Sequence, residues 1–272
     1  MHRLAILDMN NAHPNQGMRC IRQIAAGFTD SVEVVEFDVR NADELPGTDF
    51  DIYISSGGPG SPLASGEDWE RRYMNMLDEL WSINKHTDDP TEKKYCFFIC
   101  FSFQLVSRYF SSGSITQRRS MSFGTFPVHS SNDGDVDILF QGLSDPFYVA
   151  DFRDFQVVRA NYSSLGATGA SILAFEKYRP HVPYERAVMA IRWSDEWVGT
   201  QFHPEADAEG LVIHFQDETR RKIILEEHGK KKYDEMMEHL ADDAKIKHTN
   251  EVIIPGFLKR AIEALTFPYE EQ

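Results

Sequence analysis

A cysteine, a histidine and a glutamate stand where they could act as a nucleophile, its base and an orienting acid. Cys100 directly follows the apolar run 95–99 (YCFFI), which predicts a buried strand, and it precedes a segment of helical character. At such a strand-to-helix turn a thiol is exposed, and the positive end of the helix favours the thiolate. His203 and Glu205 flank a proline, so on an extended backbone their alternate side chains can address one site. Together these residue types predict acyl transfer through a covalent thioester.

Each of these residues also has a simpler explanation. A lone cysteine after an apolar strand is more often a buried structural thiol, and a lone histidine is more often structural. His203, Glu205 and His214 could suggest a metal, but neither a third close ligand nor zinc-type spacing accompanies them. We therefore expect no metal site. The sequence also lacks a phosphate-binding glycine fingerprint, so we expect no nucleotide and no other cofactor.

Three motifs, in chain order, resemble those of class I glutamine amidotransferases, and the resemblance covers most of residues 4–206. Residues 56–60 (SGGPG) match the Ser-Gly-Gly-Pro loop that follows the third strand of that family. Residues 98–104 (FICFSFQ) stand where the family has Gly-x-Cys-x-Gly-x-Gln, and residues 201–205 (QFHPE) are intact. The resemblance implies a Cys-His-Glu triad that releases ammonia from glutamine through a γ-glutamyl thioester.

The resemblance also implies roles for residues around that triad. Backbone N–H groups of Gly58 and Phe101 would form an oxyanion hole, since glycines let the backbone approach a ligand closely. Gln104 matches the position that holds the amino-acid end of glutamine, and residues 122–124 stand where family members usually carry Glu-Tyr-Gly. The residues to which the resemblance assigns substrate contacts are Gln104, Ser122, Phe123 and Gly124.

Three departures from the family pattern bear on activity. Phe98 replaces a small residue two positions before the nucleophile, and Ser102 replaces the glycine two positions after it. Phe152 and Arg153 stand where the family often has a Ser-His pair. Three hypotheses follow. The chain is a glutaminase that supplies ammonia to a separate synthetase, a hydrolase of γ-glutamyl amides or peptides, or a dormant binding or regulatory protein in which Phe98 and Phe152 block the pocket.

The segment 13–17 (HPNQG), after the first predicted strand, is a weaker candidate. Ligands gather at the carboxyl ends of strands in open α/β sheets, so this segment could line the same mouth of the sheet. A helix cap is the simpler interpretation of these residues.

Charge and cysteine content narrow the possible partners and compartment. The 272 residues carry a formal net charge of −15, which repels phosphate backbones and anionic membrane surfaces. We therefore expect neither nucleic acid nor membrane as a partner. The first apolar run, 4–7, is too short for a signal core or a membrane span. An odd number of cysteines without an export signal suggests reduced thiols in the cytoplasm.

The order of predicted elements indicates a doubly wound α/β fold. Strand-like segments 4–7, 32–39, 51–54 and 95–99 alternate with helix-like segments 16–28, 69–83 and 104–110. Such alternation predicts a mainly parallel, flavodoxin-like sheet with helices on both faces. Shorter strand-like segments follow and predict antiparallel additions to the sheet. They span residues 122–128, 157–160, 171–175, 187–193 and 197–201.

The last part of the chain has a different composition. Residues 208–247 are rich in Glu, Lys, Arg, Met and Leu, which favours helix, and Gly229 should separate two helices there. A last helix is expected over 255–265. We predict an α/β domain over 1–206 and a helical extension over 207–272 packed on it. That extension is either a solvated surface element or a docking element for a partner.

Overall fold

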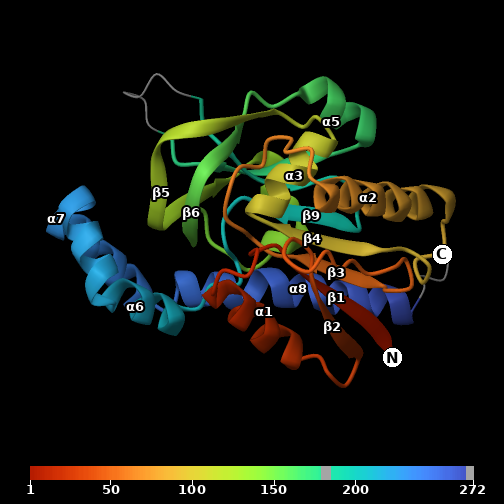
Figure 1. Cartoon of the computed structure of the whole chain (residues 1–272), viewed down its shortest axis with the longest axis horizontal. Coiled ribbons are helices and arrows are strands. Elements are labelled where there is room, and N and C mark those ends of the chain that lie inside the picture. Colours follow the sequence, from red (N-terminus) through yellow and green to blue (C-terminus); the bar gives the residue numbers. More distant parts are fainter. Residues whose placement is uncertain (179–184, 268–272) are drawn as a thin grey trace.

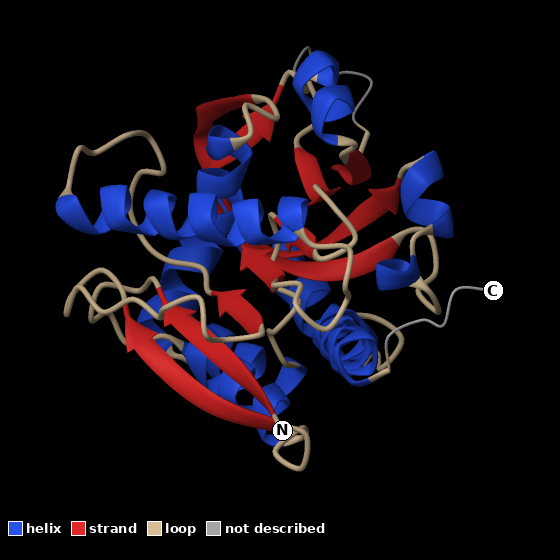
Figure 2. Cartoon of the chain, turned by 90° about the vertical axis from the view of Figure 1, so that its right-hand side faces the viewer, coloured by secondary structure: helices blue, strands red, loops and turns tan. Residues whose placement is uncertain are grey.

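The computed structural model describes residues 1–178 and 185–267, apart from five side chains within the longest helical segment, at positions 219, 220, 223, 227 and 228. These residues form a nine-stranded mixed sheet with the order β2-β1-β3-β4-β9-β8-β7-β5-β6. Helices lie on both faces of the sheet (Figures 1 and 2). The prediction of a doubly wound α/β fold is confirmed.

Five parallel strands form the half of the sheet that carries the predicted nucleophile. They are β1 (His2–Asp8), β2 (Val32–Asp38), β3 (Ile52–Ser55), β4 (Tyr95–Ile99) and β9 (Trp197–Thr200). Strands β3, β4 and β9 are buried at every residue, as expected for strands covered on both faces. Because parallel strands end at the same edge, the segments that follow β1, β3, β4 and β9 meet there.

The other half of the sheet is antiparallel. It consists of β8 (Val188–Arg192), β7 (Ser171–Glu176), β5 (Ser114–Ser130) and β6 (Phe147–Val158). The expected strands at 122–128 and 157–160 are too short, since β5 begins at Ser114 and β6 at Phe147. The register of the β5–β6 pair shifts between Gln117 and Ser122. That interval lacks an alternation of apolar and polar residues, which hides the strand pattern in the sequence.

Two layers of helices bury the two faces of the parallel strands. Helices α1 (Gln16–Ala26) and α8 (Ile246–Thr266) pack on the face that carries Leu4, Ile54 and Phe97. Helices α2 (Asp68–His86) and α3 (Phe101–Tyr109) pack on the opposite face. The short helices α4 (Asn132–Val136), η1 (Ile138–Phe140) and α5 (Tyr162–Thr168) were not predicted.

The C-terminal helices differ from their prediction in one boundary. Helix α6 (Ala208–Gln216) is followed by α7 (Glu218–Ala241), which breaks at Gly229 with φ 79° and ψ 163°, as the sequence predicted. Helix α8 begins at Ile246 instead of residue 255 and contains Pro255. A proline removes one backbone hydrogen bond, but Ile253, Ile254 and Leu258 are fully buried and hold the helix in place.

Helices α6 and α7 project beyond the β5–β6 side of the sheet (Figure 1). They are not solvated on every side, because Phe215, Ile224 and Met236 are buried together with Ala150 of β6. Within the described part of the chain, no helix is both long and apolar enough to cross a membrane.

Candidate active site

The backbone at Cys100 makes a sharp turn between β4 and α3. Its φ of 47° and ψ of −95° are a strained conformation for a residue other than glycine. Two hydrogen bonds maintain the turn: the Cys100 N–H donates to the carbonyl of Thr200 at 2.7 Å, and the Gln104 N–H donates to the Cys100 carbonyl at 3.0 Å. The predicted elbow is therefore present, and it places Cys100 at the N-terminus of α3.

Ser102, which stands where the family has glycine, is accommodated in this turn. Its side chain is fully buried, and its hydroxyl donates to the carbonyl of Ser56 at 2.7 Å. The same hydroxyl lies 2.7 Å from the hydroxyl of Ser55. Ser102 thus fastens α3 to the start of the glycine loop that follows β3.

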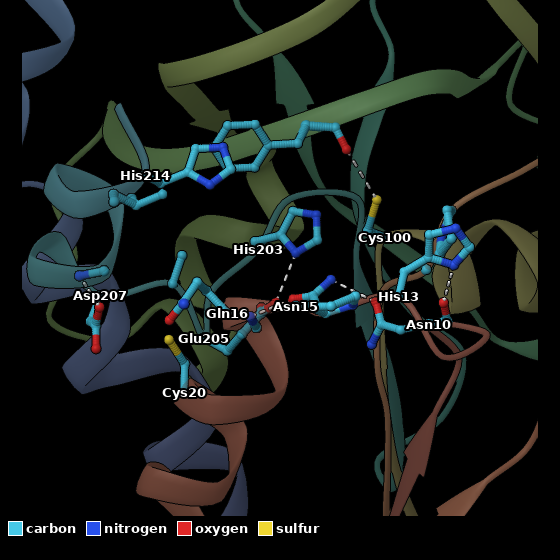
Figure 3. Close-up of a pocket in the computed structure, with 18 residues that line it drawn as sticks. Asn10, His13, Asn15, Gln16, Cys20, Cys100, His203, Glu205, Asp207 and His214 are labelled. Atoms are coloured by element: carbon cyan, nitrogen blue, oxygen red, sulfur yellow. Dashed lines mark hydrogen bonds and ion pairs between the residues drawn. The ribbon is translucent and has the colours of Figure 1, made fainter. Parts of the chain in front are cut away.

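His203 lies between Cys100 and Glu205 (Figure 3). Its backbone N–H donates to the carbonyl of Ala150 at 2.9 Å, and its Nδ1 lies 2.8 Å from Oε1 of Glu205. Since a carboxylate only accepts, Nδ1 carries the proton, and Nε2 is the free acceptor of the neutral ring. Burial disfavours the imidazolium, but the negative charges of Glu205 and of the Cys100 thiolate, together with hydrogen bonds to both, outweigh it. The pKa of His203 is raised well above its ordinary value.

Glu205 is held by two helices. Its carbonyl accepts a hydrogen bond from Nδ2 of Asn250 in α8 at 2.8 Å. Its carboxylate lies against the first turn of α1, where a Cβ on Gly17 would come within 2.9 Å of Oε1. The side chain is 2% exposed, and its Oε2 has no hydrogen-bond partner among the described residues. The N-terminal end of α1, which carries a partial positive charge, lies beside this carboxylate.

The glycine loop after β3 packs so closely that neither of its first two glycines has space for a side chain. A Cβ on Gly57 would lie 2.8 Å from Cε1 of His203 and 3.6 Å from Cβ of Cys100. A Cβ on Gly58 would lie 2.2 Å from the carbonyl oxygen of Met9. The loop is therefore in direct contact with the predicted nucleophile and base.

A cavity of about 550 Å³ opens over these residues at the carboxyl ends of the parallel strands. Its lining includes Cys100, His203, Glu205 and Gly58, so the structure brings the predicted triad and one predicted oxyanion residue together. The segment 13–17 also lines the cavity, as its position after β1 suggested, and Asn15 caps α1 as well. The remaining lining residues are Asn10, Cys20, Pro59, Phe152, Ala206, Asp207, Gly210, Leu211 and His214.

The residues assigned to substrate contact by resemblance do not line this cavity. Gln104 is buried, and its Nε2 donates at 3.0 Å to both the carbonyl of Phe155 and Oε1 of Gln201. Ser122 donates to Asp151 at 2.7 Å. The four residues, Gln104, Ser122, Phe123 and Gly124, lie behind the cavity wall in hydrogen bonds and packing contacts of their own.

Phe123 supports the wall through Phe152, whereas Gly124 lies against helix α7. The ring of Phe123 packs on the ring of Phe152 with centroids 5.0 Å apart. A Cβ on Gly124 would lie 2.8 Å from the sulfur of Met236 in α7. Phe101, the second predicted oxyanion residue, also points its ring away from the cavity, into the core beside Trp69.

Neither aromatic departure blocks the cavity. Phe98 is 1% exposed and points into the core, where its ring centroid lies 5.3 Å from that of Trp197 and 6.0 Å from that of Trp193. Phe152 does line the cavity, but it forms a wall and leaves Cys100 and His203 accessible to it. The hypothesis that these two residues close the pocket is wrong for this structure.

Several neighbours of Cys100 were missed by the sequence. Nε2 of Gln201 donates to Sγ of Cys100 at 3.8 Å, and the thiol faces the carbonyl of Phe152 at 3.8 Å. Gln201 belongs to the QFHPE motif, but nothing in the motif shows that its side chain turns inward. The cavity residues of α6, such as Leu211 and His214, belong to the predicted extension and lack a motif altogether.

The described residues contain no group of three or more His, Cys, Asp or Glu side chains arranged to hold a metal ion. The three cysteines are free thiols. Burial raises the pKa of Cys20 to about 11 and raises that of Cys96 well above its ordinary value.

Comparison with known protein families matches residues 18–211 to the family described as glutamine amidotransferase class-I. Since this match spans more than half of the chain, the protein belongs to the class I glutamine amidotransferase family. A sequence search of curated proteins found no significant match.

Solved structures share the fold at low sequence identity. A glutamine amidotransferase from Thermotoga maritima is 13% identical over 96% of this chain and 98% of its own, with a TM-score of 0.67. A glutamine amidotransferase from Methylobacillus flagellatus is 15% identical over 100% of this chain and 98% of its own, also at 0.67. The glutaminase domain of CTPS from Trypanosoma brucei, solved with bound acivicin, is 12% identical over 98% of this chain and 94% of its own, at 0.57.

Proposed function

We propose that this protein hydrolyses the side-chain amide of glutamine, with Cys100 as nucleophile, His203 as base and acid, and Glu205 as orienting carboxylate. The observation that carries the proposal is the strained elbow at Cys100, which faces the hydrogen-bonded His203–Glu205 pair across one cavity. A buried carboxylate that fixes the histidine tautomer and a thiol at a helix N-terminus are the arrangement that thiolate chemistry requires. Membership of the amidotransferase family supports the same reaction.

In the first half-reaction the thiolate of Cys100 attacks the amide carbonyl carbon and forms a C–S bond. We propose that His203, whose pKa is raised well above its ordinary value, takes the thiol proton of Cys100 and holds it as imidazolium. It gives that proton to the amide nitrogen as the C–N bond breaks. Ammonia leaves, and the glutamyl group stays on Cys100 as a thioester.

In the second half-reaction His203, now neutral, takes a proton from water, and the resulting hydroxide attacks the thioester carbonyl. The C–S bond breaks, the glutamyl group leaves as its carboxylic acid and then loses its proton to solvent, and Cys100 and His203 are again the thiolate and imidazolium that begin the cycle. Negative charge develops on the carbonyl oxygen in both halves. We assign the N–H groups of Gly58 and Phe101 to stabilise this charge, because the glycine loop and the start of α3 meet beside Cys100.

The size of the cavity favours a second candidate substrate, a γ-glutamyl amide or peptide. The cavity extends past the triad to Cys20 of α1 and to Leu211 and His214 of α6. Its volume of about 550 Å³ lies within the range of sites that hold drug-sized ligands. A leaving amine larger than ammonia would therefore find space there.

An amide-release assay tests the proposal. Purified protein is incubated with glutamine and with a series of γ-glutamyl amides, and ammonia or amine release is measured beside intact-mass detection of a glutamyl adduct. We expect release and an adduct confined to Cys100, both lost in Cys100→Ser. The substrate with the highest kcat/KM decides between the two candidates. If none is hydrolysed and no adduct forms, the chain is a binding or regulatory member of the family.

The family chemistry implies a partner for the first candidate. In this family the released ammonia passes to a synthetase, and we propose a synthetase partner if glutamine is the preferred substrate. Stimulation of glutamine hydrolysis by a co-purified synthetase would support it.

A further inference from the structure

Arg40 follows β2 and reaches across the edge of the sheet to the glycine loop. Its Nη1 donates to the carbonyl of Met9 at 3.0 Å and to the carbonyl of Pro59 at 2.6 Å. One guanidinium nitrogen thus joins the end of β1 to the loop after β3. Pro59 is the residue next to Gly58, whose N–H is one of the two proposed oxyanion donors.

The same Met9 carbonyl also determines where Gly58 lies. A Cβ on Gly58 would come within 2.2 Å of that oxygen, so the Gly58 backbone rests directly against it. Arg40 therefore holds both the surface under Gly58 and the residue that follows it. Any displacement of the Met9 carbonyl would change the position of the loop.

The guanidinium also lies over the ring of Phe101, the residue whose N–H is the second proposed donor. The Cζ of Arg40 lies 4.8 Å from the ring centroid of Phe101 and 5.1 Å from that of Trp69. Phe101 is the first residue of α3 and directly follows the nucleophile. Cations over aromatic faces are attracted by the ring quadrupole, and arginine adds stacking of its planar group.

We propose that Arg40 is a positioning residue that fixes the spacing of the Gly58 and Phe101 N–H groups, an inference that rests on the proposed amide hydrolysis. Two hydrogen bonds set the loop, and the stacked guanidinium sets the start of α3. Lysine could not replace it, since an ammonium lacks the planar group that bonds in its plane and stacks through its face.

Burial of Arg40 is consistent with this role. Its Nε is buried without a hydrogen-bond partner among the described residues, and burial lowers the pKa of the guanidinium, which the charge of Glu67 opposes. An arginine stays protonated at neutral pH in either case. A buried N–H without a hydrogen-bond partner costs free energy, and a purely structural contact would avoid that cost.

The test compares Arg40→Met and Arg40→Lys with the wild type. Arg72→Met is the matched control, because Arg72 also donates to a backbone carbonyl, but that carbonyl, of Asp43 at 2.9 Å, lies after β2, whereas Arg40 bonds Met9 and the glycine loop. Three quantities are measured: kcat and KM for amide release, the rate of Cys100 alkylation by iodoacetamide, and the free energy of unfolding. Alkylation needs the Cys100 thiolate but no oxyanion hole, so it separates an effect on the nucleophile from an effect on oxyanion stabilisation.

We expect Arg40→Met and Arg40→Lys to lower kcat by about 100-fold, the typical effect of losing one oxyanion donor, with KM within about threefold of the wild type. Alkylation of Cys100 should stay near the wild-type rate, and added guanidinium should restore part of the kcat of Arg40→Met. Arg72→Met should change none of these.

Unchanged kcat in the Arg40 variants, or alkylation that falls in parallel with kcat, would overturn the inference and leave the proposed function standing. The inference is also overturned if Arg40→Met unfolds while Arg40→Lys folds and keeps the wild-type kcat. A wild-type protein that releases nothing from glutamine or γ-glutamyl amides would overturn both.

Discussion

Gly57 is the position at which one methyl group would test the proposed geometry most directly. It lies in the loop after β3, and a Cβ there would meet Cε1 of His203 at 2.8 Å. The same atom would lie 3.5 Å from Nδ1 of His203 and 3.6 Å from Cβ of Cys100, which are ordinary contacts. Gly57→Ala therefore pushes on the imidazole ring and on little else.

The size of the effect follows from these distances. To reach an ordinary contact of 3.4 Å, the ring must retreat by about 0.6 Å from the added methyl group. The bond from Nδ1 to Glu205 anchors one side of the ring, so the retreat also tilts Nε2 relative to the thiol. Since a misplacement of about 1 Å costs on the order of 100-fold in rate, we expect kcat to fall by roughly 10- to 100-fold.

The assay is steady-state amide release by Gly57→Ala, with unfolding by urea measured in parallel. KM should change little, because the methyl group contacts the base rather than the cavity mouth, and stability should change by less than about 1 kcal/mol. Gly166→Ala is the control, since a Cβ there meets nothing within 4 Å. A Gly57→Ala enzyme with wild-type kcat would refute the assigned role of His203. So would a loss of activity fully explained by unfolding.

Four further predictions concern the triad and its neighbours. His203→Ala should abolish turnover and Glu205→Gln should reduce it less, with the double variant little worse than His203→Ala, because such groups act as a unit; additive losses would assign Glu205 another role. Because the pKa of His203 is raised on folding, its contribution to stability is complete below about pH 6.5 and lost as the pH rises through the folded value. Urea unfolding should therefore show the stability of wild type relative to His203→Ala falling toward alkaline pH. A diazo-ketone analogue of glutamine should label Cys100 and spare Cys20, whose pKa of about 11 keeps it protonated; peptide mass spectrometry that finds both labelled equally would contradict this. Phe98→Ala should lower the free energy of unfolding by about 3–5 kcal/mol, and a nearly unchanged value in urea would show that Phe98 is not a core residue.

The sequence predicted the parallel half of the sheet because its strands are continuous apolar runs between helices of clear periodicity. Strand 95–99 has the predicted bounds. The antiparallel half was harder, because half-exposed strands such as β5 carry polar residues and a register shift that interrupt any simple pattern. Helix α8 was predicted too short because Pro255 reads as a helix start, whereas burial of the preceding turns keeps them helical.

The candidate site also contains residues that short motifs predict and residues whose role depends on long-range contacts. The meeting of Cys100, His203 and Glu205 at one cavity could be predicted because each follows a recognisable strand and belongs to a short motif. Gln104 was assigned to substrate by the same resemblance, but its amide bonds to Gln201 instead, and that contact joins positions 97 residues apart. Side-chain direction at such distances depends on how strands pack, which no local pattern contains.

The departures from the family pattern separate into two groups with different consequences. Those in the elbow are compensated by their neighbours. Phe98 packs against two tryptophans and faces Gly199 on the adjacent strand, where a Cβ would come within 2.8 Å of the Phe98 carbonyl oxygen and 3.0 Å of its Cβ. Ser102 stands where the family has glycine, and its hydroxyl is accommodated by two hydrogen bonds.

The departure at Phe152 differs, because this residue lines the cavity and packs its ring beside both His203 and His214, at centroid distances of 5.9 and 5.8 Å. Phe98 packs in the core and leaves the nucleophile in place. Phe152 lies in the cavity wall, so a change there alters which substrates can reach the nucleophile. The elbow is retained beside a changed wall, which supports testing the second candidate substrate of the proposed reaction together with glutamine. Glutamine and the γ-glutamyl amides are accordingly the compounds on which the release assay should begin.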